Sequence, residues 1–203
     1  MKLNTPSQDE MKRVAQICSE REDMAHYQKE EKILKELFTQ CPKNTNLDEI
    51  TQKVAKLDKF YSAGLVRNQI PYSDMAKRIL SVDFDKRVQK WDETLVKDLA
   101  SSFAKKPFSF ASKYCVLHNH WVYNKDDFVI FDSLVCEKLK EFKKQFKNSR
   151  QKYKFMNFID KDLTLENYGK YKQILENFRD DFGLKCSLRE VDWYLWELGK
   201  LEK

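Results

Sequence analysis

Apolar residues recur along the chain at intervals of three and four positions, the spacing of one face of an α-helix. The clearest case is the sequence Ile50, Val54, Leu57 and Tyr61. Asn46 and Glu49, just before it, have the spacing of a capping box, in which two side chains close the start of a helix. The pattern therefore predicts a helix that begins near residue 47.

The same pattern predicts helices along the rest of the chain. Thr5 and Pro6 indicate the start of a charged helix to about Gln40, with a break in the twenties. Asp83 is expected to cap a helix over 85–103, which ends where Pro107 prevents continuation. Further helices are predicted over about 71–80, 109–119, 132–146, from Thr164 to Gly183, and after a capping box of Ser187 and Glu190. Residues 119–131 are expected to form a loop with one short extended piece.

Composition agrees with a helical protein. The 203 residues include only four glycines and four prolines, whereas lysine, glutamate, leucine and phenylalanine are plentiful. Apolar residues make up 41% of the chain and charged residues 34%, which excludes a disordered protein. No flexible linker is evident, so residues 1–203 are predicted to form one all-α unit of one domain or two closely packed lobes.

Other features exclude several classes of protein. The five cysteines are widely spaced without a C-x-x-C motif, which excludes a zinc finger or an iron–sulfur loop. His118 and His120 do not share a helix face, so we predict no metal site and no cofactor. No run of 18 apolar residues occurs, and "MKLNTPSQDE" lacks the core of a signal peptide. We therefore expect a cytoplasmic protein without a membrane segment.

The net charge of +6 is concentrated in one region, residues 138–154. On the helix predicted there, four lysines form a stripe beside the apolar face: Lys140, Lys143, Lys144 and Lys147. Such a stripe suits contact with phosphate groups, and it is also found on helices that simply face solvent.

Two short stretches contain the residues that suggest chemistry. In "FSFASKYCVLHNH" (108–120), Lys113 lies within an apolar segment, and in "FVIFDSLV" (128–135), Asp132 follows four apolar residues. Lys113 is either a surface lysine or a buried nucleophile. Asp132 is either a helix N-cap or a catalytic carboxylate.

The order of these elements resembles the helix–hairpin–helix superfamily of base-excision DNA glycosylases. The resemblance covers roughly residues 47–146, and it implies a two-lobed fold with catalytic roles for Lys113 and Asp132, which are 19 positions apart. It implies one lobe over about 70–146, with the hairpin at about 104–108, and a second lobe of about 1–69 with 147–203. The chain is also similar to an uncharacterised bacterial group of this type, which combines "SFASKYC", an apolar-Asp-Ser segment and "DxxLW"; here the last is "DWYLW" (192–196).

The resemblance also implies how DNA is held. Residues 57–80 resemble the helix–loop–helix that inserts a side chain into the DNA stack, and Ser62 is the nearest equivalent of the inserted residue. The family's glycine-rich hairpin is replaced by "AKKPF", so Lys105 and Lys106 are expected to contact phosphate by charge.

Three functions follow as hypotheses. The first is a DNA glycosylase, with lyase activity through a Schiff base on Lys113, that acts on a damaged base flipped out of double-stranded DNA. The second is a catalytically silent DNA-binding module of the same fold. The third is a helical protein-interaction module whose basic helix binds an acidic protein partner.

Overall fold

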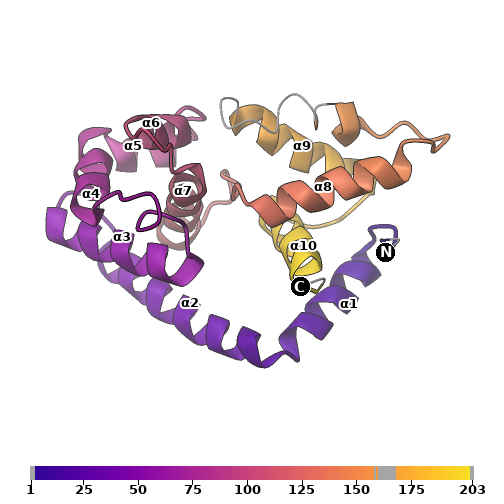
Figure 1. Cartoon of the computed structure of the whole chain (residues 1–203), viewed down its shortest axis with the longest axis horizontal. Helices are drawn as coiled ribbons and strands as arrows, with labels where there is room; N and C mark the ends of the chain where they lie inside the picture. Colours follow the sequence, from indigo (N-terminus) through magenta and orange to yellow (C-terminus); the bar gives the residue numbers. More distant parts are fainter. Residues whose placement is uncertain (1–2, 158, 160–167, 202–203) are drawn as a thin grey trace. The chain divides into compact units, whose positions relative to one another are not determined.

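The structure, a computed structural model, describes residues 3–157, 159 and 168–201, and for residues 23–26 it describes the backbone alone. Ten α-helices and one 3₁₀-helix account for the regular structure of the described residues, and none of these residues forms a β-strand (Figure 1). The prediction of an all-α protein is thereby confirmed. The helices are α1 (Gln8–Ser19), α2 (Glu22–Gln40), α3 (Leu47–Tyr61), α4 (Tyr72–Ser81), α5 (Phe84–Gln89), α6 (Leu95–Ser101), α7 (Phe108–Tyr123), α8 (Ser133–Phe146), η1 (Lys154–Asn157), α9 (Tyr168–Asp181) and α10 (Leu188–Leu201).

The chain divides into two compact units. Unit 1 comprises Met1–Ala25 and Phe131–Lys203, and unit 2 comprises His26–Ile130. This division differs from the predicted lobes, because residues 26–69 group with the central helices and residues 131–146 group with the C-terminal helices. The reason is local packing: α3 packs on α4 and α7, whereas α8 packs on α10.

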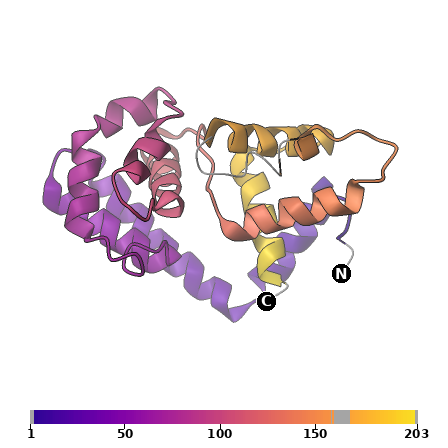
Figure 2. The ribbon, with the colours of Figure 1, turned by 45° about the horizontal axis from the view of Figure 1, so that its top comes forward.

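Unit 2 is built around α7, which packs against α3, α5 and α6 (Figure 2). α7 is enclosed on every side over much of its length, because its ten residues from 110 to 119 are all buried. The predicted apolar face of α3 is confirmed, because Ile50, Val54 and Leu57 are fully buried. A helix enclosed on all sides can hold a polar side chain in a fixed position only if that side chain finds a partner inside the unit.

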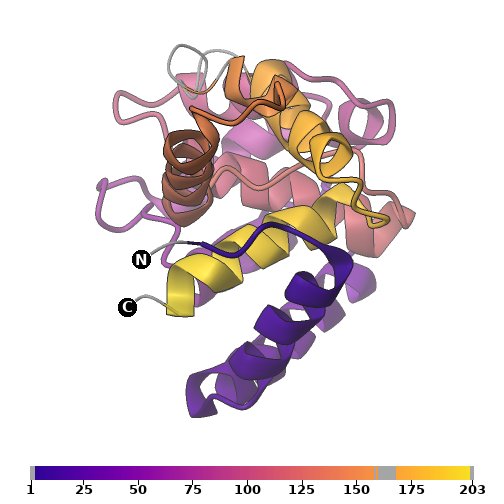
Figure 3. The ribbon, with the colours of Figure 1, turned by 90° about the vertical axis from the view of Figure 1, so that its right-hand side faces the viewer.

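Unit 1 has α10 at its centre, packed on α1, α8 and α9; Figure 3 shows α10 alongside α1. The predicted inward residues Val135, Leu139 and Phe142 of α8 are fully buried. Phe142 contacts the rings of Phe178 and Phe182 at centroid distances of 5.3 and 6.3 Å, which places an aromatic cluster beneath α8. The other face of α8 is therefore the one that solvent reaches.

The predicted single helix over 85–103 is wrong, because the chain breaks between α5 and α6. Trp91 has a left-handed backbone with φ 54°, which a continuous right-handed helix does not allow. The side chain of Arg87 holds the break by pairing with Asp92 and Asp98 at 2.7 and 2.6 Å. Asp83 precedes α5 as predicted, but its side chain makes no capping hydrogen bond.

Other boundaries are close to those predicted. α1 begins after Ser7 rather than at Thr5, because the hydroxyl of Ser7 accepts a hydrogen bond from the Glu10 N–H. α7 continues to Tyr123, so the start of the predicted loop is helical. The capping box of Ser187 and Glu190 is formed in both directions, and Asn46 caps α3 by accepting a hydrogen bond from the Glu49 N–H. The predicted helix start at Thr164 lies outside the described residues. Among described residues, no helix combines the length and the apolar character needed to cross a membrane.

Glu197 of α10 gives unit 1 a specific pH dependence. Its side chain is 3% exposed and accepts a hydrogen bond of 2.7 Å from Trp193 Nε1, and burial raises the pKa of its carboxyl to about 7. Since this pKa exceeds the unfolded value, the protonated form stabilises the fold at low pH, and that stabilisation is lost as the pH rises through 7.

We expect Glu197→Gln to remove this dependence while keeping an acceptor for Trp193. Between pH 5 and 8 the wild-type protein should lose about 3 kcal/mol of stability that the variant retains. Urea unfolding at a series of pH values measures the difference. Glu93→Gln, at an exposed position, serves as the control and should keep the wild-type pH slope. Equal slopes in wild type and Glu197→Gln would contradict the assignment.

Candidate functional site

Lys113 is buried inside unit 2. Its side chain is 3% exposed, which excludes the interpretation of a surface lysine. The ammonium nitrogen Nζ donates a hydrogen bond of 2.7 Å to Ser109 Oγ, one helical turn earlier, and lies 5.6 Å from the centre of the Tyr61 ring. Both contacts come from within the unit, one from α7 and one from the end of α3. The amine therefore occupies a defined position near the start of α7.

The turn that leads into α7 spans residues 102–107 and exposes two cations. Lys105 and Lys106 both reach solvent, whereas Pro107 and Phe108 are buried. The Phe108 N–H donates to the Lys106 carbonyl at 2.9 Å, so this part of the turn is closed by its own backbone. The positive charges of these two lysines attract any anion that approaches this turn.

The loop after α3 presents an apolar side chain that sequence analysis missed. Ser62, the predicted inserted residue, is exposed but forms the C-cap of α3, with φ 47°. Val66 is 67% exposed, the largest value among the large apolar residues described. The buried carboxylate of Asp58 accepts hydrogen bonds from the Leu65 and Val66 N–H groups at 2.9 and 3.3 Å. The loop thus holds Val66 outward on a fixed backbone.

Asp132 is the N-cap of α8, as one interpretation predicted. Its carboxylate accepts a hydrogen bond of 2.9 Å from the Leu134 N–H, and its side chain is half-buried. Burial raises the pKa of the Cys136 thiol to about 12, and the negative charge of Asp132 adds to this effect. The structure thus shows the N-cap role of Asp132, and its catalytic role stays a prediction.

The α8 helix, together with its C-cap Lys147, carries the four lysines of the predicted basic stripe. Lys140, Lys144 and Lys147 are exposed, and Lys143 is half-buried. Lys138 is not part of this stripe, because its side chain is buried and pairs with Glu141 at 2.7 Å. The exposed stripe lies on the side of α8 away from the aromatic cluster of unit 1.

A buried polar network in unit 2 was not predicted. Asn44, in the loop before α3, accepts hydrogen bonds at Oδ1 from Lys53 Nζ (2.8 Å) and Tyr114 OH (2.6 Å). Its Nδ2 donates to Asp85 Oδ1 at 2.6 Å, and the same carboxylate oxygen lies 3.2 Å from His118 Nε2. His118, next to the end of the predicted helix over 109–119, is fully buried, because α7 extends past it to Tyr123.

The protonation of this network follows from burial and pairing. Burial lowers the pKa of the Lys53 amine to about 8 and holds the pKa of His118 below its usual range. Burial disfavours the ionised form of Asp85, but hydrogen bonds from His118 and Asn44 outweigh it and lower the pKa of the carboxyl. A neutral His118, an ionised Asp85 and a charged Lys53 form a set that stabilises the loop before α3.

The sequence matches the model of a known protein family. Residues 10–126, more than half of the chain, match the family model described as the HI_0787_N N-terminal domain. The chain belongs to this family. An uncharacterised protein of Haemophilus influenzae (strain Rd) is 38% identical over 131 residues, which are 62% of this chain and 56% of that protein. The chain thus matches little more than half the length of this relative, and no solved structure matches it.

The HI_0787_N match contains some of the predicted site residues and excludes others. It includes Ser62, Lys105, Lys106 and Lys113, which all lie in unit 2, and it ends before Asp132 in unit 1. Within unit 2 the structure joins Lys113 to Ser109 and Tyr61. The catalytic roles of Lys113 and Asp132 stay predictions. No group of three metal-binding side chains occurs among the residues that the structure describes.

Proposed function

We propose that the protein is a DNA base-excision glycosylase whose lyase step uses Lys113 as the nucleophile. The observation that carries this proposal is the buried amine of Lys113, hydrogen-bonded to Ser109 Oγ at 2.7 Å. Lysines used as Schiff-base nucleophiles are commonly buried, because burial favours the neutral amine. If this position of α7 served only to support the fold, an apolar residue would cost less free energy to bury than a lysine.

The chemistry requires a neutral amine. The Lys113 ammonium must first lose its proton, and Ser109 Oγ is the hydroxyl placed to relay it. The nitrogen then bonds to the sugar C1′ of a flipped nucleotide while the C1′–base bond breaks, and the electron pair leaves with the base. One proton of the attacking nitrogen passes to the departing base. The C1′–O4′ bond then breaks as the nitrogen lone pair forms the C1′=N bond, and O4′ takes up the second nitrogen proton, which leaves an imine on Lys113. Asp132 is proposed to stabilise the positive charge that develops on the sugar.

Contact with DNA is proposed to use both charge and an apolar wedge. Lys105 and Lys106 on the turn before α7 would contact phosphates by charge. Val66, rather than Ser62, would enter the base stack, because the Asp58 carboxylate fixes its loop and its side chain is 67% exposed. Apolar wedges of this kind unstack neighbouring bases at a cost of a few kcal/mol.

Borohydride trapping tests the proposal. The protein is incubated with duplexes that carry one oxidised, alkylated or deaminated base, or an abasic site, and the imine is reduced to a stable amine. A covalent protein–DNA product on at least one duplex is the expected result. Tight DNA binding without base release or trapping on any duplex would instead support the silent DNA-binding module.

We also expect the α8 stripe to contribute to DNA affinity. Replacing Lys140, Lys144 and Lys147 by glutamine removes three exposed charges. Binding to duplexes of any sequence should weaken, and the slope of log affinity against log salt should flatten by about three. Fluorescence anisotropy at several salt concentrations measures both quantities. A triple replacement of the exposed lysines Lys12, Lys35 and Lys90 by glutamine, at positions outside α8 and outside residues 57–80, is the control for lost charge. Equal affinities in the two variants would favour an acidic protein partner for α8.

A further inference from the structure

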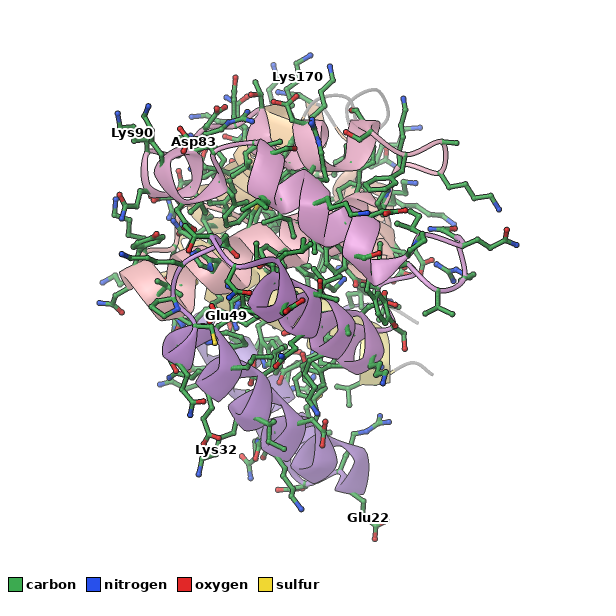
Figure 4. All side chains as sticks on the ribbon, turned by 90° about the vertical axis from the view of Figure 1, so that its left-hand side faces the viewer. Glu22, Lys32, Glu49, Asp83, Lys90 and Lys170 are labelled. Carbon is green, nitrogen blue, oxygen red and sulfur yellow. The ribbon has the colours of Figure 1, made fainter. Side chains whose placement is uncertain are left out.

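The outer side of α2 carries an apolar position that unit 2 leaves uncovered. Ile33 is 40% exposed, one of only four large apolar side chains exposed among the described residues. It borders a groove of about 510 Å³ between α2 and α3, with Leu37 and Ala55 in its apolar lining. The rim of the groove is polar, from Glu36, Gln40, Gln52, Lys56 and Lys59. Figure 4 shows this side of the molecule, with Lys32 of α2 and Glu49 of α3 labelled.

The charges on this face are arranged in a self-complementary order. Lys29 is four positions before Ile33 and Glu36 is three positions after it, and both side chains are exposed. An α-helix rises by 1.5 Å and turns by 100° per residue, so both charges lie on the same side of Ile33, about 6 Å before and about 4.5 Å after it. A cation and an anion at nearly equal distances on either side of an apolar residue match a second, antiparallel copy of the same helix.

We propose that this face binds a second copy of the chain, with the two α2 helices antiparallel about a two-fold axis near Ile33. Ile33 then meets its counterpart, and Lys29 of each copy lies opposite the partner's Glu36. Closed two-fold symmetry is the usual form of a homodimer, and it requires a patch complementary to itself. A partner of one charge sign fits this mixed face less well. The proposal is independent of the DNA chemistry at Lys113.

Sedimentation velocity of the full chain over a range of concentrations tests this proposal. Wild type should dimerise, and Ile33→Asp should weaken dimerisation on the order of a hundredfold, because each copy then places a charge on the apolar axis. Lys29→Glu alone and Glu36→Lys alone should each weaken it roughly tenfold, since each creates two like-charge contacts. The double variant Lys29→Glu, Glu36→Lys restores opposite charges and should dimerise like wild type.

Several outcomes overturn the proposal. The wild-type protein would remain monomeric at the highest concentration, or Ile33→Asp would leave the dimer intact. A double variant that dimerises no more strongly than either single variant would also overturn it. Circular dichroism of each variant establishes that the fold is retained, and all three positions are exposed. Lys35→Glu is a matched control, because it changes the charge of an exposed residue of α2 about 160° away from Ile33 and should leave dimerisation unchanged.

Discussion

Lys113→Gln is expected to abolish the borohydride-trapped adduct while DNA binding persists. Removal of a nucleophile lowers the rate of the covalent step by several orders of magnitude, because no other group then forms the bond to C1′. Glutamine has a similar length, and its amide can still donate to Ser109 Oγ, so the packing of α7 should be retained. Gel electrophoresis of the reduced reaction measures the adduct, and anisotropy measures binding to the same duplex.

Two further variants serve as comparisons for Lys113→Gln. Lys106→Gln removes an exposed cation seven positions earlier and should keep the adduct while weakening DNA binding modestly. Asp132→Asn should slow base release with little change in binding, because the amide oxygen can still accept from the Leu134 N–H. An adduct that survives Lys113→Gln would move the nucleophile to another amine and contradict the assignment.

Asn44→Ala is expected to destabilise unit 2 strongly. The Asn44 side chain is 5% exposed and accepts hydrogen bonds from the Lys53 ammonium and the Tyr114 hydroxyl. Its removal leaves a buried hydroxyl without an acceptor and weakens the pairing of a buried charge, which costs about 3 kcal/mol. For a protein of this size the Tm should fall by about 10 °C.

Asn46, two residues later in the same loop, provides the matched control. It caps α3 through hydrogen bonds from the Asp48 and Glu49 N–H groups, at an exposed position. Asn46→Ala should cost about 1 kcal/mol, the usual cost of losing an N-cap. Urea unfolding compares the two variants directly. If Asn44→Ala cost no more than Asn46→Ala, the buried network would not be the element that holds this loop.

Local periodicity predicted the helices well because it reports which face of a helix is buried. Ile50, Val54 and Leu57 on α3 and Val135, Leu139 and Phe142 on α8 lie where their spacing placed them. The break between α5 and α6 was missed because it depends on Arg87, whose partners Asp92 and Asp98 meet it only after the chain has turned. Trp91 and Leu95 keep helical spacing across that break, so the apolar pattern alone does not predict it.

The candidate site was predicted in part, and the polar network was not. The sequence indicated Lys113 because its neighbours are apolar, and burial follows from such neighbours. Asn44, Lys53, Asp85 and His118 come from four separate segments, so no local pattern joins them. Val66 could have been noticed as an apolar residue beside Gly64 in a turn, but its exposure depends on hydrogen bonds to Asp58.

The most direct test of the central claim is the position of the covalent bond in the trapped product. Wild-type protein is reduced with borohydride on the duplex that gives most adduct, digested with protease and nuclease, and mapped by tandem mass spectrometry. The account predicts a single modified residue, Lys113, with the sugar remnant on its Nζ. A remnant on Lys105, Lys106 or any lysine of α8, with Lys113 unmodified, would contradict it.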